Sequence, residues 1–254
     1  MFRAVVFLAG PSRFSNTEKS QNWSHWKPLN DSESQCVGLP DKVYIADAGL
    51  NSFLSWYEEV DSKSQSQIKS IHWCGDGDSL GDKGREFLSQ TAARFEGRWR
   101  AHLYDTKKDF SDCAAITSLI EYDLRHEDEH AGFWIDVHGA LGGRFDHEIG
   151  NVFEFASSLS RVAVPSAYVL GGETVLATCG LLGEMEVGDV FSVLPSNHQS
   201  TNVVQISNAE YAGETELRQP SHGLSNVALA KQVKIVPVRL NCPYLAIRTA
   251  KKSA

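Results

Sequence analysis

A change of pattern after residue 161 constrains the fold of this chain most. Before it, short runs rich in β-branched and aromatic residues alternate with longer segments of helical periodicity. This alternation is typical of a parallel sheet whose strands are joined by crossover helices. We expect strands at residues 4–9, 43–46, 68–74, 101–104 and 133–137, and helices at residues 50–60, 83–95, 112–125 and 145–159.

The rest of the chain predicts β structure alone. Helical periodicity is lost, and short β-rich runs at residues 175–179, 190–194, 203–207, 233–240 and 244–248 are broken by Gly, Asn and Pro. The sequence therefore predicts a fold of the class α/β plus all-β. An N-terminal parallel α/β sandwich (Rossmann-like) domain would occupy residues 1–165, and a C-terminal β-sandwich domain would occupy residues 166–254.

One segment, residues 11–41, fits neither pattern. It is polar, rich in Ser and Asn, and contains Trp23 and Trp26. A structureless loop of this length is uncommon inside a compact domain. We interpret it as a lid, a partner surface or an insertion, and we favour an arrangement in which the tryptophans pack the segment against the rest of the molecule.

Charge and cysteine content exclude several classes of protein. A formal net charge of −8 argues against a nucleic-acid surface, which needs clustered Lys and Arg. The 5 cysteines are scattered, with no Cys-x-x-Cys pair, and are expected to be reduced thiols. The apolar run at the N-terminus is too short for a signal peptide, and no run is long enough to span a membrane. We expect a cytoplasmic protein with no membrane or nucleic-acid partner.

Two acidic motifs follow predicted strands. They read GDGDS at residues 75–79 and KDFSD at residues 108–112, and they supply Asp76, Asp78, Asp109 and Asp112. Because the carboxyl ends of parallel strands meet at one edge of a sheet, these carboxylates are expected to converge there. Carboxylate oxygens are the ligands that Mg²⁺ prefers, so the sequence predicts a magnesium site at this edge.

A third motif, GALGGRFDH at residues 139–147, adds features suited to phosphate. Its glycines allow close backbone approach to an anion, and Arg144 offers paired donors to phosphoryl oxygens. Asp146 would orient Arg144 or contact a polar substrate group; the alternative is a simple ion pair at a helix start. Neither a P-loop nor a dinucleotide-binding glycine motif occurs. Metal ligands and a phosphate cradle together indicate nucleotide chemistry.

Five motifs, taken in order, resemble those of the thiamine pyrophosphokinase family. Besides the three above, the chain has DAGLN at residues 47–51 and GLSN at residues 223–226. The family pattern has glycine at Ala48 and threonine at Ser111, whereas the GGRFDH segment at residues 142–147 is unchanged. Any one motif would be weak evidence, since such strings are common in turns, but five in this order are specific.

This resemblance implies an activity and a set of site residues. The family transfers the pyrophosphoryl group of ATP to the hydroxyl of thiamine with Mg²⁺, and works as a homodimer with thiamine bound between subunits. By the resemblance, Asp76, Asp78, Asp112 and Arg144 would be catalytic, and Asp76, Asp78, Asp109 and Asp112 would bind the metal. Substrate and cofactor contacts would come from Asp47, Asn51, Ser79, Lys108, Ser111, Gly142, Gly143, Asp146, Ser225 and Asn226.

Two alternatives to this assignment stay open. Residues 209–213 only partly match an aromatic-Pro-Leu stretch that shapes the family's acceptor pocket, so the acceptor could instead be a pterin or another hydroxymethyl heterocycle. A non-catalytic regulatory module that binds thiamine diphosphate or a nucleotide is the other alternative. A zinc site is not expected, although residues 126–130 read HEDEH, because this acidic string precedes a predicted strand and should form a surface turn.

Overall fold

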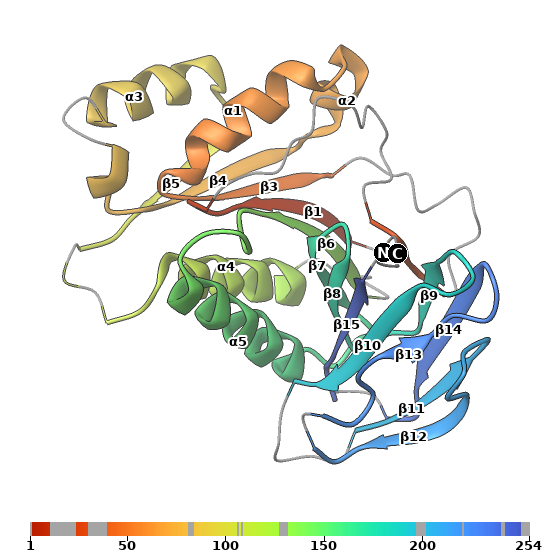
Figure 1. Cartoon of the computed structure of the whole chain (residues 1–254). Helices are drawn as coiled ribbons and strands as arrows, with labels where there is room; N and C mark the ends of the chain where they lie inside the picture. The colour runs from red at the N-terminus through yellow and green to blue at the C-terminus, as the bar shows by residue number, and fades with distance from the viewer. Residues whose placement is uncertain are drawn as a thin grey trace.

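A ten-stranded sheet runs through the molecule (Figure 1). The computed structural model describes residues 2–10, 24–29, 40–80, 84–105, 107, 109–126, 132–196, 202–219, 221–239 and 242–249. Six neighbouring strands pair in parallel, in the order β7 (Ala167–Gly171), β6 (Phe133–His138), β1 (Phe2–Phe7), β3 (Lys42–Ala46), β4 (Ser70–Gly75) and β5 (Trp99–Leu103). Beyond β7 the sheet continues antiparallel through β8 (Thr174–Ala177), β15 (Tyr244–Thr249), β10 (Val190–Pro195) and β13 (Asn226–Val227).

Helices cover both faces of the parallel part. On one face lie α1 (Gly49–Glu59), α2 (Ser62–Gln67) and α3 (Gly84–Arg94), and on the other lie α4 (Asp112–His126) and α5 (Phe145–Arg161) (Figure 1). Strand β1 serves both layers, because Ala4 and Val6 pack with the α4–α5 side while Val5 and Phe7 pack with the α1 side. Successive side chains of a strand point to opposite faces, so a strand buried on both sides has apolar residues at consecutive positions, as Ala4–Phe7 of β1 do.

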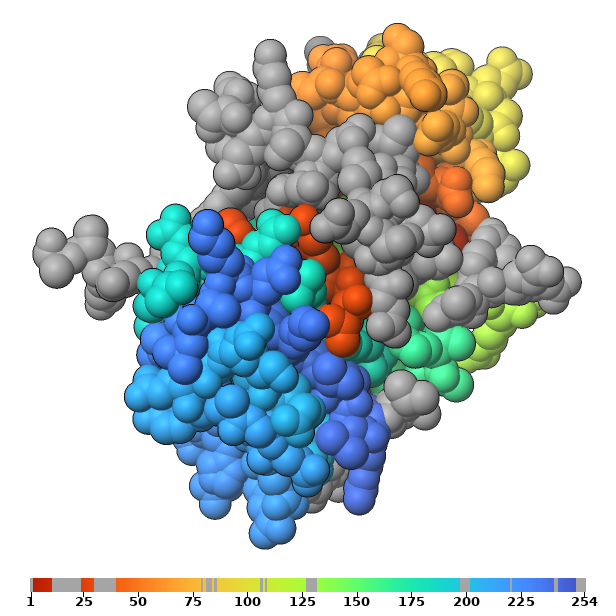
Figure 2. Space-filling model, turned by 90° about the vertical axis from the view of Figure 1, so that its right-hand side faces the viewer, coloured from red at the N-terminus to blue at the C-terminus, as the bar shows by residue number. Residues whose placement is uncertain are grey.

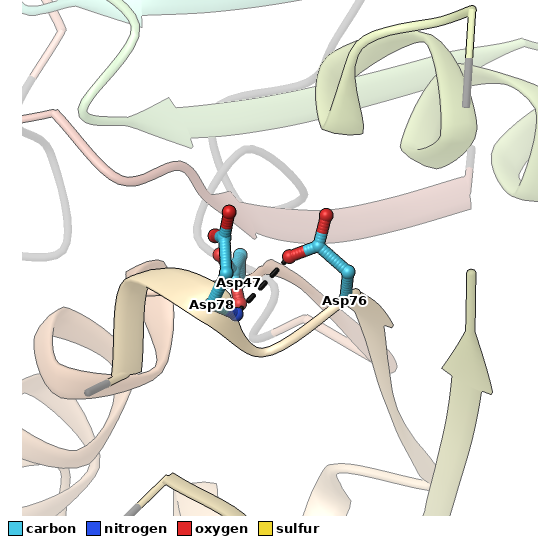
Figure 3. A group of neighbouring side chains, drawn as sticks. All are labelled: Asp47, Asp76 and Asp78. Atoms are coloured by element: carbon cyan, nitrogen blue, oxygen red, sulfur yellow. Dashed lines mark hydrogen bonds between the residues drawn. The ribbon is translucent and has the colours of Figure 1, made fainter. Parts of the chain in front are cut away.

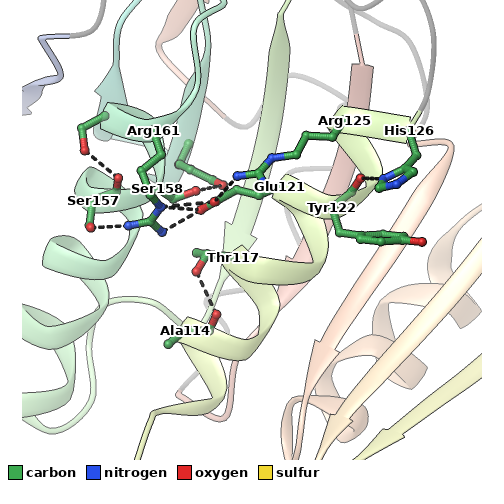
Figure 4. Close-up of polar contacts among 11 residues, drawn as sticks. Ala114, Thr117, Glu121, Tyr122, Arg125, His126, Ser157, Ser158 and Arg161 are labelled. Atoms are coloured by element: carbon green, nitrogen blue, oxygen red, sulfur yellow. Dashed lines mark hydrogen bonds and ion pairs between the residues drawn. The ribbon is translucent and has the colours of Figure 1, made fainter.

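Helices α4 and α5 are joined by an ion pair as well as by apolar packing. The guanidinium of Arg161 donates from Nε at 3.1 and 3.2 Å and from Nη2 at 2.6 Å to the carboxylate of Glu121, whose side chain is only 11% exposed (Figure 4). Arg125 also approaches Glu121, at 3.7 Å. These bonds raise the pKa of Arg161. The ion pair thus fixes the position of α5 relative to α4 on this face of the sheet.

A second, five-stranded antiparallel sheet packs against the antiparallel part of the large one. Its order is β12 (Gly213–Leu217), β11 (Asn202–Ser207), β14 (Gln232–Pro237), β9 (Leu181–Glu184) and β2 (Trp26–Pro28). One core joins the two sheets, with Phe191 and Tyr244 from the large sheet and Leu181 and Ile235 from the small one. The fold is mixed α/β with a large parallel and antiparallel sheet and a second antiparallel sheet.

Strand β2 belongs to the polar segment whose structure the sequence left open. Trp26 is 1% exposed, and its indole N–H donates to the carbonyl of Glu173 at 3.1 Å. Residues 24–29 lie among C-terminal residues on the surface (Figure 2), where β2 pairs with β9. The expectation that a tryptophan packs this segment down is confirmed for Trp26, while Trp23 falls outside the described residues.

The predicted elements agree with the structure in position. Every strand and helix expected before residue 162 is found within a few residues of its predicted bounds, whereas α2 and β2 were not predicted. The proposed division between residues 165 and 166 falls between α5 and β7, and the large sheet continues across it through the parallel pairing of β6 with β7. The division into two domains stays a prediction.

Two expectations from composition can also be compared with the structure. Within the described ranges, Cys74, Cys113, Cys179 and Cys242 carry free thiols. No helix in that same part of the chain combines the length and apolarity that crossing a bilayer requires.

The strand order defines where a ligand would bind. From β1 the chain proceeds outward to β3, β4 and β5, and α4 then returns it to β6 on the other side of β1. Open parallel sheets bind ligands at the carboxyl ends of the strands, where the order reverses in this way. The carboxyl ends of β1, β3, β4 and β6 therefore form the edge at which a site is expected.

Candidate active site

Three carboxylates gather at this edge (Figure 3). Asp47 follows β3, and Asp76 and Asp78 follow β4; each offers an oxygen within 4.8 Å of the others. Asp47 is buried, Asp76 is half-buried and Asp78 is exposed. Such a set of hard oxygen donors, graded from the interior to the solvent, suits Mg²⁺ with water and substrate oxygens completing its coordination.

The backbone at Asp47 is shaped to bring its carboxylate into this group. Its φ is 39°, in the left-handed region that aspartate tolerates better than most residues. The Asp47 N–H donates to the Cys74 carbonyl at 2.9 Å, and the Asp47 carbonyl accepts from the Trp73 indole at 3.2 Å. A Cβ at Gly75 would lie 3.0 Å from both Cβ and Oδ1 of Asp47. Glycine at residue 75 therefore makes room for the buried carboxylate.

A tight turn presents Asp76 and Asp78 together. Oδ1 of Asp76 accepts the N–H of Asp78 at 3.1 Å, and Gly77 between them has a φ of 78°. A side chain that accepts from the backbone two residues later is a recurrent turn of aspartate, and glycine adopts the positive φ without strain. Asp76 and Asp78 thus lie close together, as their spacing of two residues predicts, while their role as metal ligands stays a prediction.

The other predicted ligands are placed differently. Ser111 caps α4, its Oγ accepting the N–H of Ala114 at 3.1 Å, as expected for this residue. The thiol of Cys74 lies 4.0 Å from the carbonyl oxygen of Asp112, so α4 begins beside the end of β4. Neither Asp109 nor Asp112 belongs to the three-carboxylate group found among the described residues. Their role as ligands stays a prediction, and Asp47, predicted only as a binding residue, takes the third position.

The glycine loop approaches the same edge from the other side of β1. A Cβ at Gly139, whose φ is 76°, would come within 2.7 Å of the Leu8 carbonyl and 2.8 Å of the Gly10 carbonyl. The loops after β1 and β6 thus touch backbone to backbone. Since β1 separates β6 from β3, the loop and Asp47 stand about two strand spacings, or roughly 10 Å, apart at this edge.

Arg144 precedes α5 and is engaged in an ion pair. Its Nη2 and Nε donate to the two carboxylate oxygens of Asp146 at 2.6 and 3.2 Å, and the side chains are 74% and 65% exposed. The hydrogen bond from Arg144 lowers the pKa of Asp146, and the same bond raises the pKa of Arg144. The structure thus contains the helix-start ion pair that was the alternative interpretation, in a loop that also carries Gly142 and Gly143.

Ser225 and Asn226, predicted as binding residues from the C-terminal GLSN motif, form hydrogen bonds within the chain. Asn226 is 2% exposed; its Oδ1 accepts the N–H groups of Tyr211 and Val227 at 3.0 and 2.9 Å, and its Nδ2 donates to the Tyr211 carbonyl at 2.9 Å. Ser225 has a φ of 57° and donates its N–H to Ser192 Oγ at 3.1 Å. Asn226 therefore holds the chain at Tyr211, whose own side chain is 65% exposed. Contact of either residue with an acceptor stays a prediction.

Of the other predicted positions, one lies in the first turn of α1 and the side chains of the rest lie outside the described residues. Asn51 is exposed in the first turn of α1, and its N–H donates to the Ala48 carbonyl at 3.2 Å. Lys108 and the side chain of Ser79 are not among the described residues, nor are residues 127–130 of the HEDEH string. His126, which is described, ends α4 with its Nδ1 2.7 Å from the Tyr122 carbonyl.

One residue of the site was missed in the sequence. Glu148, in the first turn of α5, accepts the N–H of Gly142 at 2.8 Å through Oε1. In the sequence, Glu148 lies six residues after Gly142 and one helical turn after Arg144. No rule of residue spacing predicts a contact between Glu148 and Gly142.

Comparison with solved structures identifies the fold. Thiamine pyrophosphokinase from Bacillus subtilis matches with a TM-score of 0.57 at 15% identity, covering 99% of this chain and 100% of that chain. A thiamin pyrophosphokinase family protein from Enterococcus faecalis gives 0.58 at 14% identity, covering 99% and 100%. Thiamin pyrophosphokinase from Candida albicans gives 0.59 at 11% identity, covering 98% and 90%. The structure thus fits the fold of the thiamine pyrophosphokinase family. The sequence itself matches no protein-family model and no curated protein.

Proposed function

We propose that this chain is a Mg²⁺-dependent thiamine pyrophosphokinase, which transfers the pyrophosphoryl group of ATP to the hydroxyl of thiamine and releases AMP. The observation that carries the proposal is the Asp47–Asp76–Asp78 group at the carboxyl edge of the sheet, in a chain with the fold of thiamine pyrophosphokinases. Cytoplasmic location and a homodimer with active sites between subunits are further parts of the proposal.

The donor set fits a magnesium ion. Asp47, Asp76 and Asp78 would hold it through carboxylate oxygens, and bound there it would neutralise phosphate oxygens and align the transferring group. Three carboxylates close together repel one another, so they are better explained by a cation than by folding alone. Two observations support a magnesium ion here: all three donors are carboxylate oxygens, and the group extends from the buried Asp47 to the exposed Asp78.

Hydrogen-bond donors of the chain would stabilise the rest of the phosphate charge. Phosphoryl transfer needs little covalent chemistry from the protein; it needs charge stabilisation and an in-line arrangement of nucleophile and leaving group. Arg144 offers two parallel N–H donors, which now engage Asp146, and the glycine loop offers backbone N–H groups. A polyphosphate between this loop and the carboxylates would meet positive donors at one end and the metal at the other.

Thiamine-dependent formation of AMP tests the proposal. Purified protein with ATP, Mg²⁺ and thiamine should produce AMP and thiamine diphosphate in equal amounts, and chelation with EDTA should abolish both. Asp78→Asn should lower turnover by at least about a hundredfold, because it removes one of three charged ligands. Folded protein that forms no AMP with thiamine would defeat the assignment.

A second acceptor class is favoured by one observation. The segment that should supply an aromatic-Pro-Leu stretch instead places a single exposed aromatic side chain, Tyr211, in the loop that Asn226 holds. An acceptor panel of thiamine, hydroxymethylpterins and other hydroxymethyl heterocycles would separate the two classes by their rates of AMP formation. A regulatory binding module would bind these ligands but produce AMP with none of them.

A further inference from the structure

Two anion donors of the glycine loop are occupied by carboxylates of one helical turn. The guanidinium of Arg144 is paired with Asp146, and the N–H of Gly142 donates to Oε1 of Glu148 at 2.8 Å. Both carboxylates come from the first turn of α5. A carboxylate oxygen on a backbone N–H stands where a phosphoryl oxygen would be bound, since both are anionic acceptors.

Contacts other than that of Glu148 also hold the loop. Asn151, further along α5, donates from Nδ2 to the Ala140 carbonyl at 3.1 Å. The loop is also fixed at Gly139 by its backbone contacts with Leu8 and Gly10. Removal of the Glu148 carboxylate should therefore leave the loop in place and change only what the Gly142 N–H binds.

We propose that Glu148 is a built-in competitor for the anionic ligand of this loop, and that it occupies the Gly142 N–H until a phosphoryl oxygen displaces it. The inference rests on the proposed function, which supplies the polyphosphate. One N–H donor serves one strong acceptor at a time, so the apparent dissociation constant is the intrinsic one divided by the fraction of loops that are open. Glu148 is half-buried and remains in contact with water, so its release is inexpensive.

This arrangement also bears on how products leave. A site with fully exposed donors would retain a diphosphate product, whereas a carboxylate that returns to Gly142 competes for the donor and favours release. The ligand class is set by the chemistry of the loop: an inorganic or organic polyphosphate with at least one oxygen that can reach a backbone N–H. Ligands that do not use this N–H should be indifferent to Glu148.

Binding of inorganic pyrophosphate to the full chain, measured by titration calorimetry with and without Mg²⁺, tests the proposal. Glu148→Ala should tighten binding by roughly threefold to tenfold, because the donor no longer has an internal partner. Glu148→Gln retains an oxygen acceptor without the charge and should give a smaller gain. Glu154→Ala removes an equal charge from the same helix, without a hydrogen bond to the loop, and should change affinity by less than about twofold.

The outcomes separate this inference from the proposed function. If the wild-type protein binds neither pyrophosphate nor ATP, the anion site itself is wrong and both fail. If the wild type binds pyrophosphate but Glu148→Ala binds it equally or more weakly, Glu148 orders the loop instead of competing for it, and this inference alone fails. Circular dichroism of each variant establishes that it is folded, and Glu148→Gln serves as the second variant if Glu148→Ala is not.

Discussion

Neutralising Asp76 should stabilise the metal-free protein while removing its response to Mg²⁺. Asp76→Asn keeps the oxygen that accepts the Asp78 N–H at 3.1 Å, so this contact within the turn is retained while the carboxylate charge is removed. The oxygens of Asp47 and Asp78 lie within 4.8 Å of Asp76. At this distance two unit charges repel by about 3.5 kcal/mol at an effective dielectric constant of 20.

Solvent reduces this repulsion, because Asp76 is only half-buried and Asp78 is exposed. We expect a net gain of about 1 kcal/mol in the free energy of unfolding, which for a chain of this size is a rise of about 2–4 °C in melting temperature. Saturating Mg²⁺ should stabilise the wild type by about 2.7 kcal/mol when its concentration is 100 times the dissociation constant. The variant should lose most of that gain.

Differential scanning fluorimetry in EDTA and across a Mg²⁺ titration measures both effects. Asp109→Asn is the matched control, because this carboxylate lies outside the group of three. The reasoning would be refuted if Asp76→Asn lowered the melting temperature in EDTA, or if it responded to Mg²⁺ as the wild type does. An equal loss of the Mg²⁺ response in Asp109→Asn would return Asp109 to the ligand set.

Three further predictions concern the scaffold. Burial, helped by a neighbouring histidine, lowers the pKa of His72 from 6.5 to about 4, so the unfolded state binds more protons in this interval. The contribution of His72 to the free energy of unfolding should therefore fall by about 2 kcal/mol as the pH drops from 7 to 5, and His72→Gln should remove that share of the pH dependence in urea denaturation. Glu121→Gln weakens the bonds to Arg161 that join α4 to α5, and should cost about 1–2 kcal/mol by the same method. Asn226→Ala removes three hydrogen bonds, two of them to the backbone of Tyr211, and should speed amide exchange at that residue while costing about 1–3 kcal/mol.

Controls for these variants come from the same elements. Arg125→Gln removes the longer contact of Glu121, 3.7 Å, and should have less effect than Glu121→Gln. Asn208→Ala removes an exposed amide that donates to Gln232, and should leave exchange at Tyr211 unchanged. A pH slope that is the same with and without His72, or unchanged exchange at Tyr211 in Asn226→Ala, would contradict the corresponding argument.

Much of the architecture was predictable because local sequence determines it. The runs that became β1, β3, β4 and β6 are mostly apolar, which is typical of strands buried on both faces, and Ser111 indicated the start of α4. Helix α2 was missed because its residues, Ser62–Gln67, are polar and its one signal is the Asp61 cap. The pairing of β8 and β15 with the large sheet could not be predicted, since nothing in a strand's own sequence specifies a distant partner.

In the site, the contacts made within one turn were predictable from the sequence, and the contacts between separate elements were not. Asp76 and Asp78 share one turn, so their proximity follows from two residues of spacing. Asp47 joins them only because β3 and β4 pair in a register that sets Ala46 beside Cys74, and because Gly75 leaves space for its carboxylate. The contact of Glu148 with Gly142 depends on how α5 leaves its loop, which is a property of the tertiary structure.

The position of β15 has a consequence for how the chain is made. This strand, Tyr244–Thr249, is inserted between β8 and β10, strands whose residues are synthesised about 50 to 70 positions earlier. Until it emerges from the ribosome, both neighbours present open edges, and open edges pair readily with other chains. Completion of the large sheet thus waits for β15, and a nascent chain stalled before residue 244 would depend on chaperones to remain unaggregated.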